Sequence, residues 1–266
     1  MAIQIIIVII LTFVINLVTT LSYAVRLVGV RTNRVAISFA LFNILVLIAR
    51  TANGFQAPIL AKTVENDIKN GIVANTEVFR YIILSCTLAT IVGALLIPSF
   101  QKILSKAVVG FSAHKSMGKL LLQCFSRSGM LYIKANIAMP VSDNFSSMKF
   151  DSSFPWRIFI VNVVAVSVVT VGVLSAVYAS YLNPEYRNTA SNLSAFVNGF
   201  STILMFVFVD PHLSVMADDV VLGKCSDHSF KTYIGYMILA RFGGTLLAQI
   251  LFLPVAELLA RTATYI

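Results

Sequence analysis

The chain has 266 residues, of which 58% are hydrophobic and only 12% are charged, and its formal net charge is +9. Ordinary globular chains are about 45–50% apolar and about 25% charged. So few charged residues cannot cover a soluble surface, which excludes a soluble globular domain. We therefore predict an all-α integral membrane protein that forms one polytopic domain over residues 1–266.

The first apolar segment covers about residues 2–28. It has no positively charged n-region and exceeds the roughly 7–15 residues of a signal-peptide core, so we predict a retained transmembrane helix. A membrane-spanning helix needs about 20 mostly apolar residues. Five more such stretches give six spans in total, and they cover about residues 35–60, 79–98, 156–182, 189–209 and 232–259. Proline marks several of the predicted ends, as at Pro98, Pro155, Pro184 and Pro211.

The connection between the third and fourth spans, residues 99–155, has a pattern of its own. Its first part, "SFQKILSKAVVGFSAHKSMGKLLLQCF", repeats apolar residues at helical spacing: Ile103, Leu104, Ala107, Val108 and Phe111. This pattern predicts a cytoplasmic amphipathic helix on the inner membrane face. A helix that covers the cytoplasmic mouths of the bundle fits the same pattern. The following polar segment, "VSDNFSSMKFDSSF", predicts a loop.

The distribution of Lys and Arg predicts the orientation, because cytoplasmic loops are enriched in these residues. With the N-terminus outside, thirteen basic residues fall on inner segments and five on outer ones. We therefore predict both termini outside, with residues 99–155 and 210–231 cytoplasmic. The positive charge then reflects topology and attraction to anionic membrane lipids, and does not indicate a nucleic-acid partner.

Polar residues within the spans are the candidate binding groups. An arginine at the centre of a membrane helix costs about 2.5–3.5 kcal/mol, so it faces the bundle interior or a hydrated cavity. Arg26, Arg50 and Arg241 each have neutral polar neighbours at helical spacing. The neutral residues fit hydrogen bonding between helices, whereas the arginines favour binding of an anion such as phosphate. The predicted substrate-binding residues are Arg26, Asn43, Arg50, Asn53, Arg241, Thr245 and Gln249.

The acidic residues gather in "VDPHLSVMADDVVLGK", residues 209–224. We expect Asp210 and Pro211 to break the fifth helix, with Asp218 and Asp219 about two turns later. Salt bridges to Arg26, Arg31 or Arg241, or proton or ion coupling, are the roles that fit these acids. Metal-dependent diphosphate enzymes need further carboxylates at helical spacing, and nucleotide-binding and nucleophile-elbow motifs do not occur. We therefore predict no metal, no cofactor and no catalytic residue.

Three strings of the chain resemble the bacterial Amj family, whose name means alternate to MurJ. They are "TLSYAVRLVGVRTNRVAIS", "LFNILVLIARTANGFQAP" and "VDPHLSVMADDVVLGK", and they occur together with six predicted spans. The resemblance implies a lipid II flippase of the bacterial plasma membrane that serves peptidoglycan synthesis and carries the undecaprenyl-pyrophosphate-linked precursor to the outer leaflet. It assigns no individual residue. The arginines described above would supply the cations for the pyrophosphate.

Two other functions fit the residue patterns and stay open at this stage. One is a membrane-embedded enzyme that modifies polyprenyl lipids with Asp210, Asp218 and Asp219, and the other is a non-transporting subunit whose polar stripes bind a partner protein. The expected partners are lipid II and membrane lipids. A homodimer is a further expectation, because six spans enclose little room for a disaccharide-pentapeptide and symmetric pairing is the commonest route to a larger assembly.

Overall fold

The computed structural model describes residues 2–114 and 154–266, and the elements that it contains there are all helices. Within this described part, six helical segments are long and apolar enough to cross a membrane: Ile3–Arg31, Val35–Lys69, Thr76–Lys106, Trp156–Leu182, Arg187–Val221 and Asp227–Tyr265. The prediction of an all-α membrane protein with six spans is confirmed.

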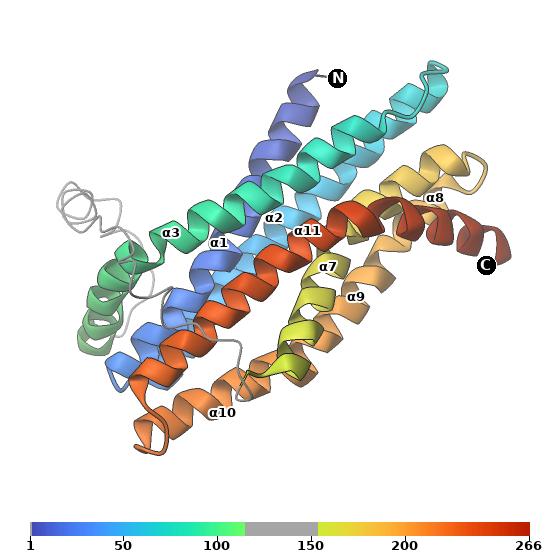
Figure 1. The fold of residues 1–266 in the computed structure, drawn as a ribbon. Helices are drawn as coiled ribbons and strands as arrows, with labels where there is room; N and C mark the ends of the chain where they lie inside the picture. The colour runs from blue at the N-terminus through green and yellow to red at the C-terminus, as the bar shows by residue number, and fades with distance from the viewer. Residues whose placement is uncertain (1, 115–153) are drawn as a thin grey trace.

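The helices form one elongated bundle (Figure 1). Their bounds are α1 Ala2–Arg31, α2 Val35–Lys69, α3 Thr76–His114, α7 Trp156–Leu182, α8 Arg187–Asn192, α9 Ser194–Leu204, the π-helix η1 Met205–Val209, α10 Asp210–Val221 and α11 Asp227–Tyr265. Both chain termini lie toward the upper right end in Figure 1, and the α1–α2 and α10–α11 connections lie at the lower left end. We call these the terminal end and the loop end of the bundle.

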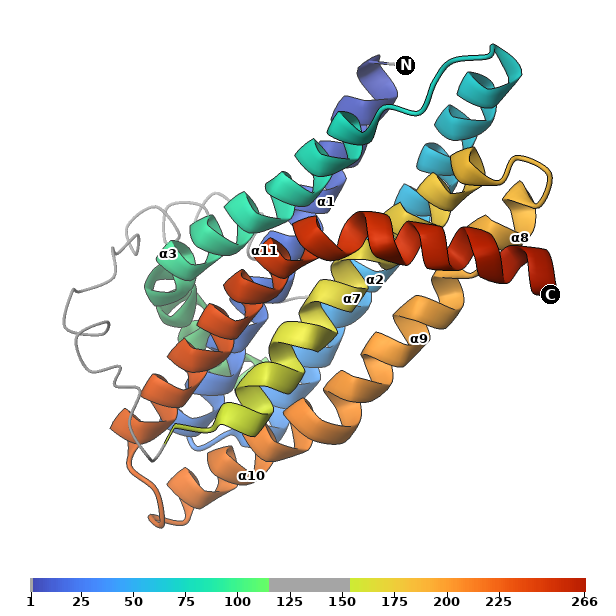
Figure 2. The same ribbon diagram turned by 45° about the vertical axis from the view of Figure 1, so that its right-hand side comes forward.

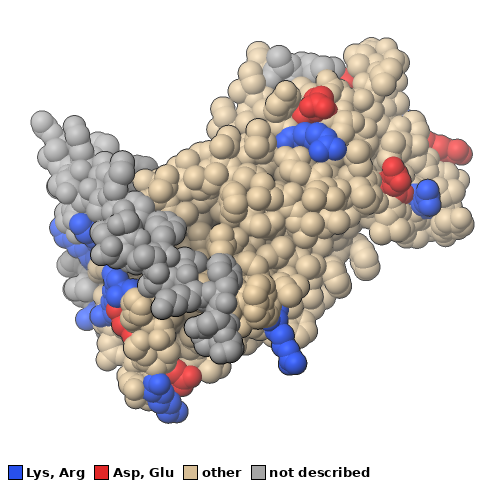
Figure 3. All heavy atoms as spheres, in the orientation of Figure 1, with Lys and Arg blue, Asp and Glu red and all other residues tan. Residues whose placement is uncertain are grey.

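Charged side chains gather at these two ends. On the face drawn in Figure 3, Lys, Arg, Asp and Glu lie toward the lower left and the upper right, and a broad band without them crosses the middle. Such a band matches the apolar interior of a bilayer, in which every charge is costly. The long axis of the bundle therefore runs across the membrane.

Glycines allow two pairs of helices to approach closely, α1 with α3 and α7 with α11. A Cβ atom added at Gly93 of α3 would lie 2.7 Å from the Cβ of Thr20 on α1. One added at Gly244 of α11 would lie 2.8 Å from the carbonyl oxygen of Val163 on α7. Because lipid is as apolar as a side chain, close backbone packing at small residues drives such association in membranes. These two pairs form much of the frame around the cavity described below.

Three of the described helices run through a proline, and the first of them is α2, which contains Pro58. The sequence predicts that the third span ends at Pro98, but α3 continues to His114. Likewise α11 contains Pro254, and Figure 2 shows α11 changing direction on its way to the C-terminus. A proline removes one backbone hydrogen bond, and membrane helices tolerate this loss because neighbouring groups compensate for it. The helix therefore does not end at Pro98, while the predicted boundary of the membrane span at that residue stays a prediction.

The segment after Pro98 begins as the last part of α3 and not as a separate helix. Its apolar residues Leu104 and Val108 are buried in a cluster with Val25 and Val28 of α1 and Phe42 of α2. This apolar face contacts protein at those positions. The predicted location of the segment on the membrane surface stays a prediction, and its part from residue 115 to 153 lies outside the described residues.

The fifth span also continues beyond its predicted end. Instead of a break at Asp210 and Pro211, the π-helical turn η1 leads directly into α10, which reaches Val221. Pro211 lies in the first turn of α10, where a missing N–H costs little. The predicted break is therefore replaced by a single π-helical turn, a feature that occurs frequently at functional sites.

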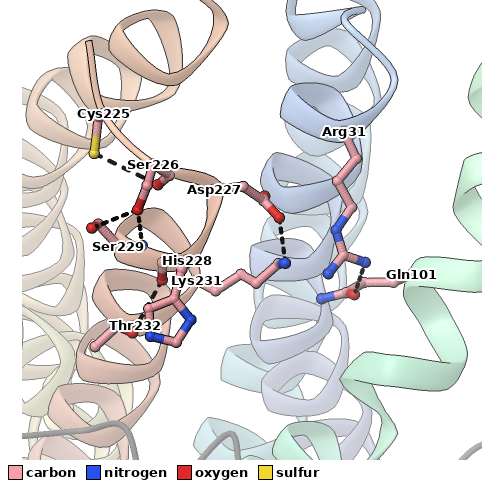
Figure 4. A network of polar contacts seen from close by, with 9 residues as sticks. All are labelled: Arg31, Gln101, Cys225, Ser226, Asp227, His228, Ser229, Lys231 and Thr232. Atoms are coloured by element: carbon pink, nitrogen blue, oxygen red, sulfur yellow. Dashed lines mark hydrogen bonds and ion pairs between the residues drawn. The ribbon is translucent and has the colours of Figure 1, made fainter. Parts of the chain in front are cut away.

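Polar contacts fix both ends of the bundle. At the terminal end, the Tyr181 hydroxyl of α7 donates to the Asp67 carboxylate of α2 at 2.5 Å. At the loop end, shown in Figure 4, Arg31 of α1 donates to Gln101 of α3 at 2.9 Å. The Ser226 side chain caps α11 by accepting from the Ser229 backbone N–H at 3.0 Å. These contacts hold α1 to α3 and α2 to α7, so they help to position the helices that line the cavity.

Candidate functional site

A cavity of about 470 Å³ lies inside the bundle. Its wall comes mainly from α1, α2, α7 and α9. The other lining residues are Cys86 of α3, Met205 and Phe206 of η1, Asp210 of α10 and Arg241 of α11. Small-molecule sites have volumes of roughly 300–1,000 Å³. The rim includes exposed residues, among them Gly54 of α2 and Ala195 of α9, so the cavity communicates with the outside of the bundle.

Arg241 is the buried cation of this cavity that has only neutral partners. Its side chain comes from α11 and is 4% exposed. Nε donates to the Thr20 hydroxyl at 3.1 Å, and Nη2 donates to the Asn16 side-chain oxygen at 2.9 Å, both on α1. Among the described residues no carboxylate forms an ion pair with it. A buried charge without a counter-charge is unfavourable, so this position favours an anionic ligand.

Arg26 lies in the same cavity but has a counter-charge. This α1 residue forms an ion pair with Asp210 of α10. Its guanidinium also lies 4.3 Å from the ring centroid of Phe42 on α2, a cation–π contact. Nε and Nη1 of Arg26 are buried and have no hydrogen-bond partner in the part of the chain that the structure describes. Asp210 therefore satisfies Nη2 of this guanidinium, whereas Nε and Nη1 are left without a partner.

The two arginines lie at different depths. Asn16, which binds Arg241, and Arg26 are ten residues apart on α1, and a rise of 1.5 Å per residue separates their Cα atoms by about 15 Å. Arg26 is close to the loop end of the bundle, and the Arg241 guanidinium is further toward the terminal end. The two guanidinium groups therefore lie at two different levels of the same cavity.

The structure brings four of the ten predicted residues to the cavity wall: Arg26, Asn53, Asp210 and Arg241. Arg50 is part of α2, but its side chain lies outside the described residues. The structure does not bring Asn43, Thr245 or Gln249 to this wall. Asn43 is exposed, the Thr245 hydroxyl donates to the Phe242 carbonyl at 2.8 Å, and Gln249 donates to the Arg80 carbonyl of α3 at 3.0 Å.

The three acids of the predicted cluster are not together. Asp210 faces the cavity, whereas Asp218 is exposed and Asp219 is half-buried further along α10. Neither Asp218 nor Asp219 forms an ion pair with a described residue. In residues 2–114 and 154–266 no group of three or more His, Cys, Asp or Glu side chains could hold a metal ion. This separation gives no support to an enzyme that uses the three acids jointly.

The ten predicted residues omit three amides of the cavity wall, Asn16 on α1, Gln56 on α2 and Asn198 on α9. Gln56 follows Asn53 by three residues, so helical spacing places both on one face, and this signal could have found it. Asn198 has Ser194, Ser201 and Thr202 at i−4, i+3 and i+4, so the same spacing marks a polar face of α9 that could have found it.

Comparison with known proteins identifies the family. Residues 11–263 match the family described as "Alternate to MurJ", or Amj. Over 252 residues the chain is 36% identical to a protein of Bacillus subtilis (strain 168) named "Lipid II flippase Amj". The matched region covers 92% of this chain and 91% of that relative. No solved structure matches the chain. The resemblance inferred from the three strings is confirmed, and the chain belongs to the Amj family.

Proposed function

We propose that this protein is a lipid II flippase, which carries the undecaprenyl-pyrophosphate-linked peptidoglycan precursor from the inner to the outer leaflet of the bacterial plasma membrane. Membership of the Amj family and the name of the Bacillus subtilis relative support this function. Six helices able to span a membrane, and a cavity between them that carries polar groups in a mostly apolar wall, are the parts that such a transporter needs. The protein is thus a transporter and not an enzyme.

The observation that carries the binding mechanism is the charge of Arg241. This residue is buried at the cavity wall, and its partners Thr20 and Asn16 are neutral. A guanidinium presents parallel N–H donors that match two phosphate oxygens. The pyrophosphate of lipid II would balance the charge and bind in the cavity, while the prenyl tail stays in the bilayer.

Arg26 and Arg50 are the proposed additional cations of the transport path. Arg26 lies nearer the loop end, where its Nη2 pairs with Asp210 and its Nε and Nη1 have no partner among the described residues. Arg50 precedes Asn53 by three residues on α2, so the two positions share a helix face. A pyrophosphate that moves along the cavity would pass from one guanidinium to the next.

The proposed orientation has both termini outside the cytoplasm. The excess of Lys and Arg on the segments that would then face inward supports it. In this orientation the loop end is cytoplasmic. Lipid II would therefore enter near the ion pair of Arg26 and Asp210 and leave toward the terminal end.

We also propose a homodimer, because a cavity of about 470 Å³ suits a drug-sized ligand and is small for a disaccharide-pentapeptide. A second copy of the chain would enlarge the enclosed space. Mass measurement in native lipid tests the proposal. A monomer that transports lipid II at the full rate would contradict it.

Reconstitution tests the function itself. Purified protein in liposomes should move fluorescent lipid II between leaflets without added nucleotide. Arg241→Ala should abolish this movement, whereas Arg261→Ala, which removes an exposed arginine of the same helix, should not. Membrane insertion and melting of both variants must match the wild type. A wild-type protein that leaves lipid II in place, or that converts it chemically, would disprove the proposal.

A further inference from the structure

The polar groups of the cavity wall are of two kinds. On α1 they are already bonded within the protein: the Thr12 and Thr19 hydroxyls donate to backbone carbonyls, and Asn16 donates to the Thr12 carbonyl and accepts from Arg241. On α2 and α9 most of them are not, although the Ser201 hydroxyl of α9 donates to the Ala165 carbonyl at 2.7 Å. No described residue forms a hydrogen bond with the side chains of Asn53, Gln56, Asn198 or Thr202, which all line the cavity.

Gln56 is the clearest of these unpartnered groups. It is 4% exposed, yet its amide atoms are not sealed from the cavity. A primary amide carries two donors and one acceptor oxygen. Buried polar side chains are nearly always hydrogen-bonded in proteins. An amide that is buried, unpartnered and on the wall of a cavity indicates a ligand with matching donors and acceptors.

Asn198 presents a donor to the same space. Its Oδ1 atom is buried without a partner and rests against Gly172 of α7, where an added Cβ atom would collide with it. The amide nitrogen Nδ2 is therefore the atom left to reach the cavity. Helix α9 thus supplies a hydrogen-bond donor, and α2 supplies complete amides from Asn53 and Gln56.

These amides lie at the depth of Arg241. On α2, Phe42 contacts Arg26, and Asn53 is eleven residues, or about 16 Å, further along. On α1, Asn16 is about 15 Å from Arg26 in the same direction, because α1 and α2 run antiparallel. Asn198 is twelve residues, or about 18 Å, from Asp210, the ion-pair partner of Arg26. Gln56 is one turn beyond Asn53, so the three amides lie at or within a few ångströms beyond the level at which Arg241 binds Asn16, on the side of the terminal end.

We propose that Asn53, Gln56 and Asn198 form a subsite for the N-acetylated sugar attached directly to the pyrophosphate of the lipid. This inference rests on the proposed function and refines it. The acetamido group and hydroxyls of such a sugar supply the donors and acceptors that these amides lack. A cavity of about 470 Å³ holds a pyrophosphate with one sugar, so the rest of the headgroup extends beyond the amides. The cavity therefore recognises the headgroup of the lipid only as far as the first sugar.

Binding of three lipids to purified protein in nanodiscs tests this subsite. The lipids are undecaprenyl pyrophosphate, the same lipid carrying N-acetylmuramic acid, and lipid II. The wild type should bind the two sugar-bearing lipids with similar affinity and the bare pyrophosphate on the order of tenfold more weakly, since each net hydrogen bond is worth a several-fold change. Gln56→Ala should weaken only the sugar-bearing lipids by about the same factor.

Matched variants keep the outcomes separate. Asn198→Ala should repeat the effect of Gln56→Ala from another helix, and Asn43→Ala, an exposed asparagine of α2, should change nothing. Arg241→Ala should weaken all three lipids, including the bare pyrophosphate. If Arg241→Ala leaves the binding of the three lipids unchanged, the proposed anion site is disproved. The result for Gln56→Ala then still decides whether the sugar subsite exists. Equal binding of the three lipids by Gln56→Ala and wild type, or lipid II bound far more tightly than the one-sugar lipid, would overturn the inference.

Discussion

Arg241 of α11 donates two hydrogen bonds to α1, one to Thr20 and one to Asn16, across a sequence separation of more than 200 residues. Both partners are neutral, so the bonds orient the guanidinium without cancelling its charge. Arg26 differs, because Asp210 pairs with it. The same residue type therefore plays two roles in one cavity, and the nature of the partner distinguishes them.

We expect Arg241→Lys to transport lipid II more slowly than the wild type, by roughly tenfold, and faster than Arg241→Ala. Lysine keeps the positive charge but loses the parallel donors of the guanidinium. Initial rates of lipid II movement in liposomes at matched protein content give the comparison. A lysine variant as inactive as the alanine variant would show that the guanidinium geometry, and not the charge, controls binding.

Breaking the ion pair of Arg26 and Asp210 should destabilise the protein. Asp210→Asn leaves a buried guanidinium without its counter-charge, and loss of one partner of a buried pair costs about 3–5 kcal/mol. Arg26→Met with Asp210→Asn removes both charges and should recover most of that loss. Thermal melting in detergent measures each variant. Equal melting of the single and the double variant would show that the pair does not contribute to stability.

Proton coupling is the second proposed role of Asp210. A carboxylate beside the cavity can favour one conformation when it binds a proton. Asp210→Asn should then lose the response of transport to pH and membrane potential, whereas Asp219→Asn, further along α10, should keep it. Flux in liposomes with imposed gradients measures both. A normal response in Asp210→Asn would rule out coupling through this residue.

The sequence was sufficient for the helical spans, because the bilayer requires long apolar segments and these are visible in composition alone. It failed at Asp210–Pro211, where the expected helix break does not occur, and it did not predict that α3 continues past Pro98. Proline ends helices in water, where the freed groups bind solvent, but membrane helices continue through it. Helix ends inside a membrane are thus set by neighbouring helices more than by the local residues.

The site was predictable only in part, for a different reason. Helical spacing correctly placed Arg26, Asn53 and Arg241 on interior faces, and all three line the cavity. The same spacing extended the stripe of Arg241 to Thr245 and Gln249, which instead face packed interfaces. A helical stripe gives the direction of a side chain but not which neighbour lies at each turn. Pairing such as Arg241 with Asn16 depends on tertiary structure.

Topology should follow the charge asymmetry. In a variant whose three cysteines are replaced by serine, Val73→Cys in the α2–α3 connection should react with a membrane-impermeant reagent in intact cells. Lys224→Cys in the α10–α11 connection should react only after permeabilisation. Both native side chains are exposed, so access to the correct side of the membrane decides the result. The reverse pattern would place both termini in the cytoplasm and contradict the positive-inside assignment.

Gly244 should be the least tolerant of the helix glycines toward larger residues. A Cβ atom there would lie 2.8 Å from the Val163 carbonyl oxygen, and backbone cannot move aside as a flexible side chain can. Gly244→Val should therefore separate α11 from α7 and destabilise the protein by about 1–3 kcal/mol. It should also weaken transport, because α11 carries Arg241 into the cavity.

Gly199→Ala is the matched control, since no atom lies within 4 Å of a Cβ added at Gly199 of α9. That control should melt at or slightly above the wild-type temperature, because alanine favours a helix over glycine by roughly 0.5–1 kcal/mol. A stable, active Gly244→Val protein would show that the close approach of α7 and α11 is not needed to position Arg241.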